Sequence, residues 1–105
     1  MSVVISAWRR LNEPRAGKTL GFCSISWFGL ILDGIPVNES PTGLFVDTPK
    51  RRGADGRFYP VFRFPTVADR VAFRSAVLAA LMREYPEDFA GFEAEKPRNI
   101  KAVRD

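Results

Sequence analysis

The 105-residue sequence contains no histidine and a single cysteine, Cys23. Histidine is the commonest general base and the commonest metal ligand, so its absence excludes Ser/His and Cys/His nucleophile pairs and Cys/His zinc sites. None of the twelve acidic residues stands in a paired-carboxylate motif. We therefore expect a protein that is not an enzyme, with no catalytic residues, metal, cofactor or small-molecule substrate. A ligand-sized pocket lined by convergent carboxylates would revive the enzyme hypothesis.

Long hydrophobic runs are also missing. No segment approaches the length of a membrane span, and the N-terminal MSVVISAWRRLNE lacks the basic and then apolar pattern of a secretory signal. A lone cysteine cannot form an intrachain disulfide, which is typical of an intracellular protein. The sequence therefore predicts a cytoplasmic protein without a membrane partner.

The chain has the length of one domain, and its nine Phe and two Trp residues supply a core. Residues before Pro65 predict a meander of short antiparallel strands, because β-branched and aromatic residues alternate between turn signals. Phe28-Gly29 predicts a tight turn, Asp33-Gly34 a break in a strand, and residues 12–18 and 38–43 loops. The expected strands are 3–11, 19–27, 30–37, one starting at 44–48, and a return strand at 57–64.

One long helix is expected at residues 66–85. Thr66 is a capping residue with Asp69 three positions later, and Pro86 ends the helix. Apolar residues recur on one side at helical spacing, with Phe73 on the flank of that stripe. The stem of Arg74 is expected to run along the edge of the core. The residues of the expected core face are Val67, Val71, Val77, Leu78, Leu81, Met82 and Tyr85.

These elements predict an α+β fold, with about five short antiparallel strands packed against one long helix. Residues 1–86 would form the domain. Residues 87–105 would add a short docked turn around Phe89 and Phe92, and then a mobile basic tail from Lys96 onwards. An unpaired strand edge is a liability, and we expect a homodimer formed across strand edges to remove it.

Positive charge is concentrated in the middle of the chain. The net charge is only +4, yet residues 50–74 contain seven basic and two acidic residues. The sequence pI is about 9.7. Clustered arginine in a basic protein is the electrostatic signature of a polyanion binder, although a basic run is also typical of an ordinary soluble surface.

The basic cluster coincides with a predicted hairpin. Ala54-Asp55-Gly56 is a hairpin-turn signal, because Asp-Gly tolerates positive φ. A two-stranded ribbon can enter a nucleic-acid groove, and the planar arginine fork suits phosphate. The expected phosphate contacts, to DNA or RNA, are Lys50, Arg51, Arg52 and Arg57, with Arg63 and Arg70 as secondary candidates and Arg9-Arg10 as weaker ones.

The aromatic residues of this segment have two interpretations. Phe58 and Tyr59 interleave with the cations and are suited to stacking on bases. Phe58, Phe62 and Phe64 are nevertheless expected to be mainly core residues, because the sheet must pack on the helix. A second hypothesis makes the protein an interaction module of the cell-division or regulatory machinery, whose basic hairpin binds an acidic partner.

The same segment resembles the bacterial SpoVG (septation/stage V sporulation protein G) family. The similarity lies in Gly43-Leu44-Phe45-Val46, Pro49, Arg51-Arg52 and Asp55-Gly56-Arg57-Phe58, with further matches in the opening VISAWRRLNE and in Ala76-Val77-Leu78. The resemblance implies a small α+β homodimer that binds DNA and RNA through the basic residues. It also implies a role in gene regulation, septation and, in spore formers, sporulation. Lys50, Arg57 and Phe62-Arg63-Phe64 depart from the family pattern, and residues 12–18 and those after Tyr85 lie outside it.

Overall fold

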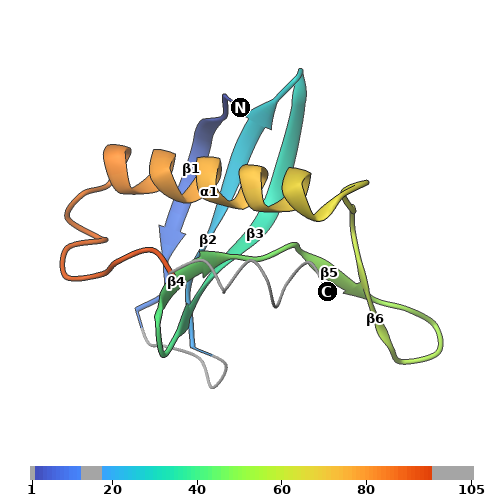
Figure 1. Cartoon of the computed structure of the whole chain (residues 1–105). Helices are drawn as coiled ribbons and strands as arrows, with labels where there is room; N and C mark the ends of the chain where they lie inside the picture. Colours follow the sequence, from blue (N-terminus) through green and yellow to red (C-terminus); the bar gives the residue numbers. More distant parts are fainter. Residues whose placement is uncertain (1, 13–17, 96–105) are drawn as a thin grey trace.

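Four antiparallel strands form a central sheet in the order β1-β2-β3-β4 (Figure 1). The computed structural model describes residues 2–12 and 18–95. The central strands are β1 (Val4–Arg10), β2 (Thr19–Trp27), β3 (Leu30–Ser40) and β4 (Gly43–Val46). A separate two-stranded sheet follows, made of β5 (Lys50–Arg52) and β6 (Phe58–Pro60), and the helix α1 (Val67–Glu84) comes after it. The predicted α+β fold is confirmed.

The β2–β3 connection is the predicted tight turn. Phe28 and Gly29 both have positive φ, 52° and 78°, as a two-residue hairpin turn requires. The expected break at Asp33-Gly34 is an irregularity within one continuous strand, where Gly34 has a φ of 70° and the register with β2 shifts. The predicted loop at 38–43 was wrong for residues 38–40, which belong to β3, and for Gly43, which begins β4. The pairing of β3 with β4 overrides a loop-like composition.

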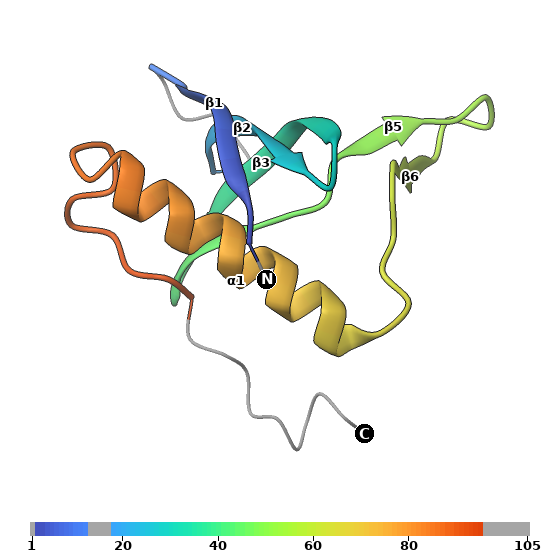
Figure 2. The same cartoon turned by 90° about the horizontal axis from the view of Figure 1, so that it is seen from above.

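The helix begins and ends where the sequence predicts. The Thr66 side chain accepts a hydrogen bond from the Asp69 backbone N–H at 3.0 Å, and Tyr85 is the C-cap. Asp69 in the first turn and Arg83 in the last complement the helix dipole. Figures 1 and 2 show α1 crossing one face of the central sheet.

The core lies between that face and α1, and its helical centre is Phe73, only 1% exposed. The ring of Phe73 lies 5.3 Å from Trp27, 5.8 Å from Phe62 and 5.0 Å from Phe64, measured between ring centroids. Such distances suit tilted and edge-to-face aromatic contacts. The expected packing of Phe62 and Phe64 against the core is confirmed.

Three predicted core residues are exposed instead. Val67 and Val71 are 49% and 51% exposed, because the first turns of α1 lie off the sheet, beyond β3 in Figure 1. Phe73, expected on the flank, therefore takes the central position. Phe58 is 66% exposed because it belongs to the β5–β6 hairpin, which extends away from the helix.

The outer edge of β4 is covered by residues that follow the helix. The Leu44 N–H donates to the Glu93 carbonyl at 2.8 Å, and the Glu95 N–H donates to the Leu44 carbonyl at 2.7 Å. A Cβ on Gly43 would lie 2.6 Å from the Glu93 oxygen, so this close approach requires glycine.

Residues 87–92 pack at the other end of the helix. Phe89 is buried with its ring centroid 5.1 Å from that of Trp8, and Phe92 is half-buried, whereas Ala90 is exposed. The basic tail expected from Lys96, and positions 13–17 of the expected loop at 12–18, lie outside the described residues. Within the described ranges, no helix has both the length and the apolar character needed to cross a membrane.

Replacing Phe73 tests the packing of the helix. Phe73→Ala should lower the free energy of unfolding by about 3–5 kcal/mol, since it removes a buried ring and leaves a cavity. Phe58→Ala makes the same chemical change on the exposed hairpin and should alter the free energy of unfolding by less than about 0.5 kcal/mol. Urea denaturation measures both values, and equal destabilisation by the two variants would contradict this account of the core.

Candidate nucleic-acid interface

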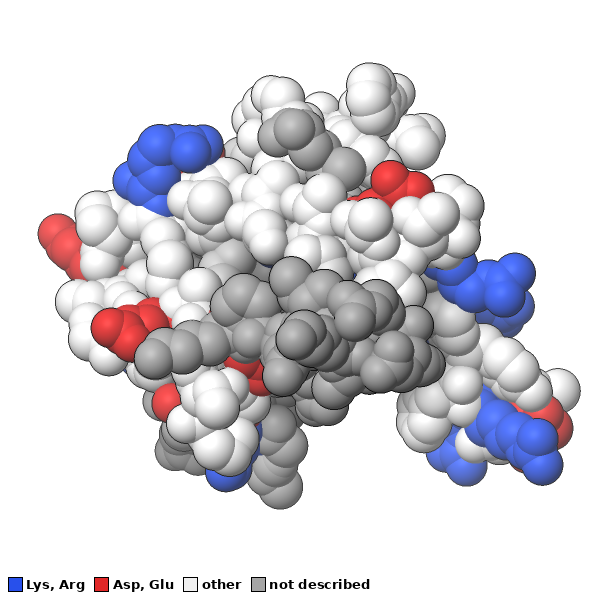
Figure 3. Space-filling model, viewed as in Figure 1, with Lys and Arg blue, Asp and Glu red and all other residues white. Residues whose placement is uncertain are grey.

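The β5–β6 hairpin projects from the body of the protein as a two-stranded ribbon (Figures 1 and 2). Its register pairs Lys50 with Pro60, Arg51 with Tyr59 and Arg52 with Phe58. Each residue of the two strands is exposed. In Figure 3, basic surface gathers over this projecting ribbon. The run of three cations thus stands clear of the core.

Local sequence explains the hairpin. The Gly56 N–H donates to the Gly53 carbonyl at 3.0 Å, Gly56 has a φ of 83°, and the Gly53 N–H donates to the Arg57 carbonyl at 2.7 Å. This is a tight turn followed by a left-handed glycine, one of the common ways to close a hairpin. The predicted turn is confirmed. The predicted return strand was too long, because only Phe58–Pro60 pair with β5 before the chain turns back toward α1.

Cations and aromatic rings share both faces of the ribbon. Side chains alternate along a strand and cross-strand partners share a face, so Arg51 lies beside Tyr59 on one face. Arg52 lies beside Phe58 on the other face, together with Lys50. Each face therefore offers a guanidinium next to an aromatic ring, a combination that many proteins use to bind single-stranded nucleic acids.

The acidic residue at the hairpin tip, Asp55, forms hydrogen bonds within the hairpin. The Tyr59 hydroxyl donates a short hydrogen bond to Asp55, and the Arg57 backbone N–H donates to the same carboxylate at 3.0 Å. These bonds, that of Tyr59 first, lower the pKa of Asp55, and the carboxylate in turn raises the pKa of Tyr59. A Cβ on Gly53 would lie 2.6 Å from the Tyr59 ring, so the ring rests against the turn.

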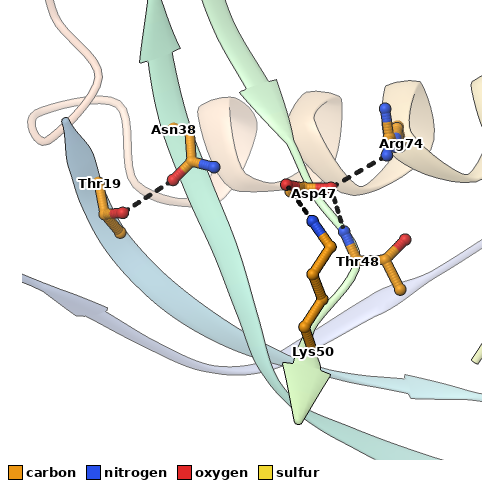
Figure 4. A network of polar contacts seen from close by, with 6 residues as sticks. All are labelled: Thr19, Asn38, Asp47, Thr48, Lys50 and Arg74. Carbon is orange, nitrogen blue, oxygen red and sulfur yellow. Dashed lines mark hydrogen bonds and ion pairs between the residues drawn. The ribbon is translucent and has the colours of Figure 1, made fainter. Parts of the chain in front are cut away.

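Asp47 joins the base of the hairpin to the helix (Figure 4). Its carboxylate lies 3.1 Å from the Arg74 guanidinium and 3.6 Å from the Lys50 ammonium, and it accepts the Thr48 N–H at 2.7 Å. Arg74 is half-buried, and burial is the main cause that lowers its pKa, as expected for a stem at the core edge. The Nε of Arg74 is shielded from solvent and has no hydrogen-bond partner among the described residues. An unsatisfied buried donor costs about 1–3 kcal/mol.

The basic residues of the hairpin differ in whether they are paired with a carboxylate. Lys50 is held by the Asp47 carboxylate at the hairpin base. Arg51, Arg52 and Arg57 are exposed and form no salt bridge within residues 2–12 and 18–95. Asp47 was not among the predicted site residues. Its position just before the basic run is nevertheless a usable sequence signal, since a carboxylate there is near the cations that follow.

The secondary candidates fall in two places. Arg63 and Arg70 line an open groove between the hairpin base and the start of α1, together with Lys50. Arg10 is at the opposite edge of the sheet, where its guanidinium donates to the Asp88 carbonyl at 2.8 Å. The sheet register places Arg10 three strands from β4, on the order of 14 Å away. The structure thus groups the six principal and secondary candidates around the hairpin, and it leaves Arg9-Arg10 apart.

The described residues also bear on two other kinds of site, a metal centre and a reactive thiol. In the part of the chain that the structure describes, no three His, Cys, Asp or Glu side chains gather in a way that could hold a metal ion. Burial raises the pKa of the Cys23 thiol to about 12, which keeps it protonated and unreactive.

No family model and no curated protein matches this chain.

The tip hydrogen bonds predict a specific titration. Tyr59→Phe should raise the pKa of Asp55 toward its ordinary value, because the largest stabilising contact of the carboxylate is removed. In the wild type the stabilisation from the Tyr59–Asp55 hydrogen bond is fully present above the ordinary pKa of aspartate. It is lost as the pH falls through the lowered pKa of Asp55, where the carboxylate becomes protonated. Carboxyl ¹³C NMR measures this titration. Tyr85→Phe, remote from the tip, should leave the Asp55 curve unchanged, and an unchanged curve in Tyr59→Phe would refute the assigned contact.

Proposed function

We propose that this protein binds DNA or RNA without catalysing a reaction, through the basic β5–β6 hairpin. Lys50, Arg51, Arg52 and Arg57 would contact phosphates. The observation that carries the proposal is the combination, on one projecting ribbon, of three exposed arginines without salt bridges in the described structure and two adjacent aromatic rings. Arginine's weakly hydrated planar fork suits phosphate oxygens.

The aromatic residues support a preference for single strands. Phe58 is 66% exposed and Tyr59 is 42% exposed, and neither is needed to close the core. A base stacked on either ring would contribute roughly 1–3 kcal/mol in a sequence-tolerant way. Bases of a duplex are already stacked on each other and are less available to these rings.

The resemblance to the SpoVG family extends the proposal. We propose a homodimeric regulator of gene expression, linked to septation or to another step of cell division, that works in the cytoplasm. Cys23, a buried free thiol, is consistent with a reducing compartment. Support for the dimer comes from the sheet edges: residues 93–95 cover β4, whereas β1 has no second neighbour among the described strands.

The salt dependence of binding tests the proposed function. Fluorescence anisotropy with labelled single-stranded DNA, duplex DNA and RNA should show affinity falling as salt rises, because bound phosphates release counterions. Arg51→Gln/Arg52→Gln should weaken binding and flatten the slope of log K against log salt by about 1.4 for a single strand, corresponding to two lost contacts.

The control variant removes the same number of positive charges as Arg51→Gln/Arg52→Gln, at positions outside the hairpin. Lys18→Gln/Arg83→Gln removes two exposed cations that lie away from the hairpin and are not candidate phosphate contacts, so it should leave the slope unchanged. Absence of binding by the wild type at low salt would refute nucleic-acid binding and favour an acidic protein partner. Equal losses in the two double variants would mean that the hairpin has no special role.

The oligomeric state is tested by light scattering coupled to size exclusion. We expect a mass of twice the 11.8 kDa of one chain. The concentration dependence of that mass shows whether the dimer is stable. A mass of one chain at all concentrations would contradict the homodimer, and it would leave the binding proposal intact because each hairpin is complete within one chain.

A further inference from the structure

An open groove of about 460 Å³ lies between the base of the β5–β6 hairpin and the first turns of α1. Four cations line it, Lys50, Arg63, Arg70 and Arg74, against one carboxylate, that of Asp47. The groove therefore carries a net charge of +3. Its volume is within the range of small-molecule sites, about 300–1,000 Å³.

The carboxylate does not neutralise all of these cations. Asp47 is already shared between Lys50 and Arg74, and Arg63 and Arg70 form no salt bridge with any residue that the structure describes. Arg70 lies one helical turn before Arg74, a spacing at which like charges repel. The charge of Arg70 adds to burial in lowering the pKa of Arg74. An anion in the groove would relieve this repulsion.

The groove also has an apolar side. Pro60, Phe62, Phe64 and Pro65 line it beside the cations, and the two rings are half-buried on the Phe73 cluster. Both rings pack on Phe73, so they form an apolar side of the groove against which a planar group can stack. An apolar side next to a cluster of arginines suits a ligand that has both an aromatic ring system, to stack on the phenylalanine rings, and a phosphate, to bind the arginines.

We propose that this groove binds a nucleoside phosphate, with the phosphate on Arg63, Arg70 and Arg74 and the base against Phe62 and Phe64. The inference rests on the proposed function and deepens it: Lys50 belongs to both the groove and the hairpin. A single strand crossing the hairpin would thus place one of its nucleotides in the groove.

The first experiment titrates ¹⁵N-labelled protein with adenosine 5′-monophosphate, adenosine and inorganic phosphate, followed by NMR. The monophosphate should shift the amides of residues 62–70 and the Nε–H signals of the groove arginines. Adenosine and inorganic phosphate should each bind at least about tenfold more weakly, because each lacks one half of the interaction. Shifts confined to residues 50–60, or equal binding of all three compounds, would overturn the proposal.

A charge-matched pair of variants locates the site. Arg63→Gln/Arg70→Gln removes two groove cations and should abolish monophosphate binding, whereas Arg51→Gln/Arg52→Gln makes the same charge change on the hairpin and should leave it intact. Both pairs are exposed, and amide spectra verify that each variant is folded. Wild-type affinity in Arg63→Gln/Arg70→Gln would refute the groove.

Competition with an oligonucleotide identifies the source of the nucleotide. If a ten-residue single strand displaces the monophosphate, the groove takes a nucleotide of the bound strand. If the monophosphate binds the groove and the strand does not displace it, the site takes free nucleotides, which refutes the link to the hairpin. If the strand binds the hairpin and the monophosphate does not bind, the groove proposal fails while the proposed function stands.

Discussion

The packing of the helix on the sheet and on the base of the hairpin depends on one buried side chain, that of Phe73. Its ring meets Trp27 from the central sheet and Phe62 and Phe64 from the segment that returns from the hairpin. One side chain thus joins the helix, the sheet and the base of the ribbon. Because aromatic rings bury large areas, this cluster holds the segment that returns from the hairpin against the core.

Separation of the hairpin from the core allows it to carry so many cations. A buried arginine requires a partner for its charge, and Arg74, the one nearest the core, has Asp47. The arginines of the ribbon are in water, where their charges cost little, and they need no internal partner. The only acid in the hairpin, Asp55, is held by Tyr59 and a backbone N–H, so the surface that the ribbon presents is basic.

Asp47 has the complementary role at the base of the ribbon. It links Arg74 of the helix to Lys50 of the hairpin, so the two elements that border the groove are tied by the same carboxylate (Figure 4). Because it is shared, it neutralises only part of the positive charge around it. Asp47 therefore connects the two sides of the groove, and the groove keeps a net positive charge. That charge is the electrostatic basis of the anion-binding proposal.

The sequence by itself determined the elements with local signals. The span of α1 followed from the Thr66 cap and Pro86, β2 from its alternation, and the two turns from Phe28-Gly29 and Asp55-Gly56. The basic run at Lys50–Arg52 was likewise visible as the candidate site. These features depend on neighbours in the chain, for which propensity and spacing are sufficient.

Only the tertiary structure decided which apolar residues are buried and which charges are paired. Val67 and Val71 fit the helical stripe, yet they are exposed because the sheet ends before it reaches them, and Phe58 is exposed because its hairpin leaves the core. The contacts of Asp47 with Arg74, and the groove with Arg63 and Arg70, join residues from separate elements. Periodicity identifies one face of an element but carries no information about where the facing element ends, so these features required the packed structure.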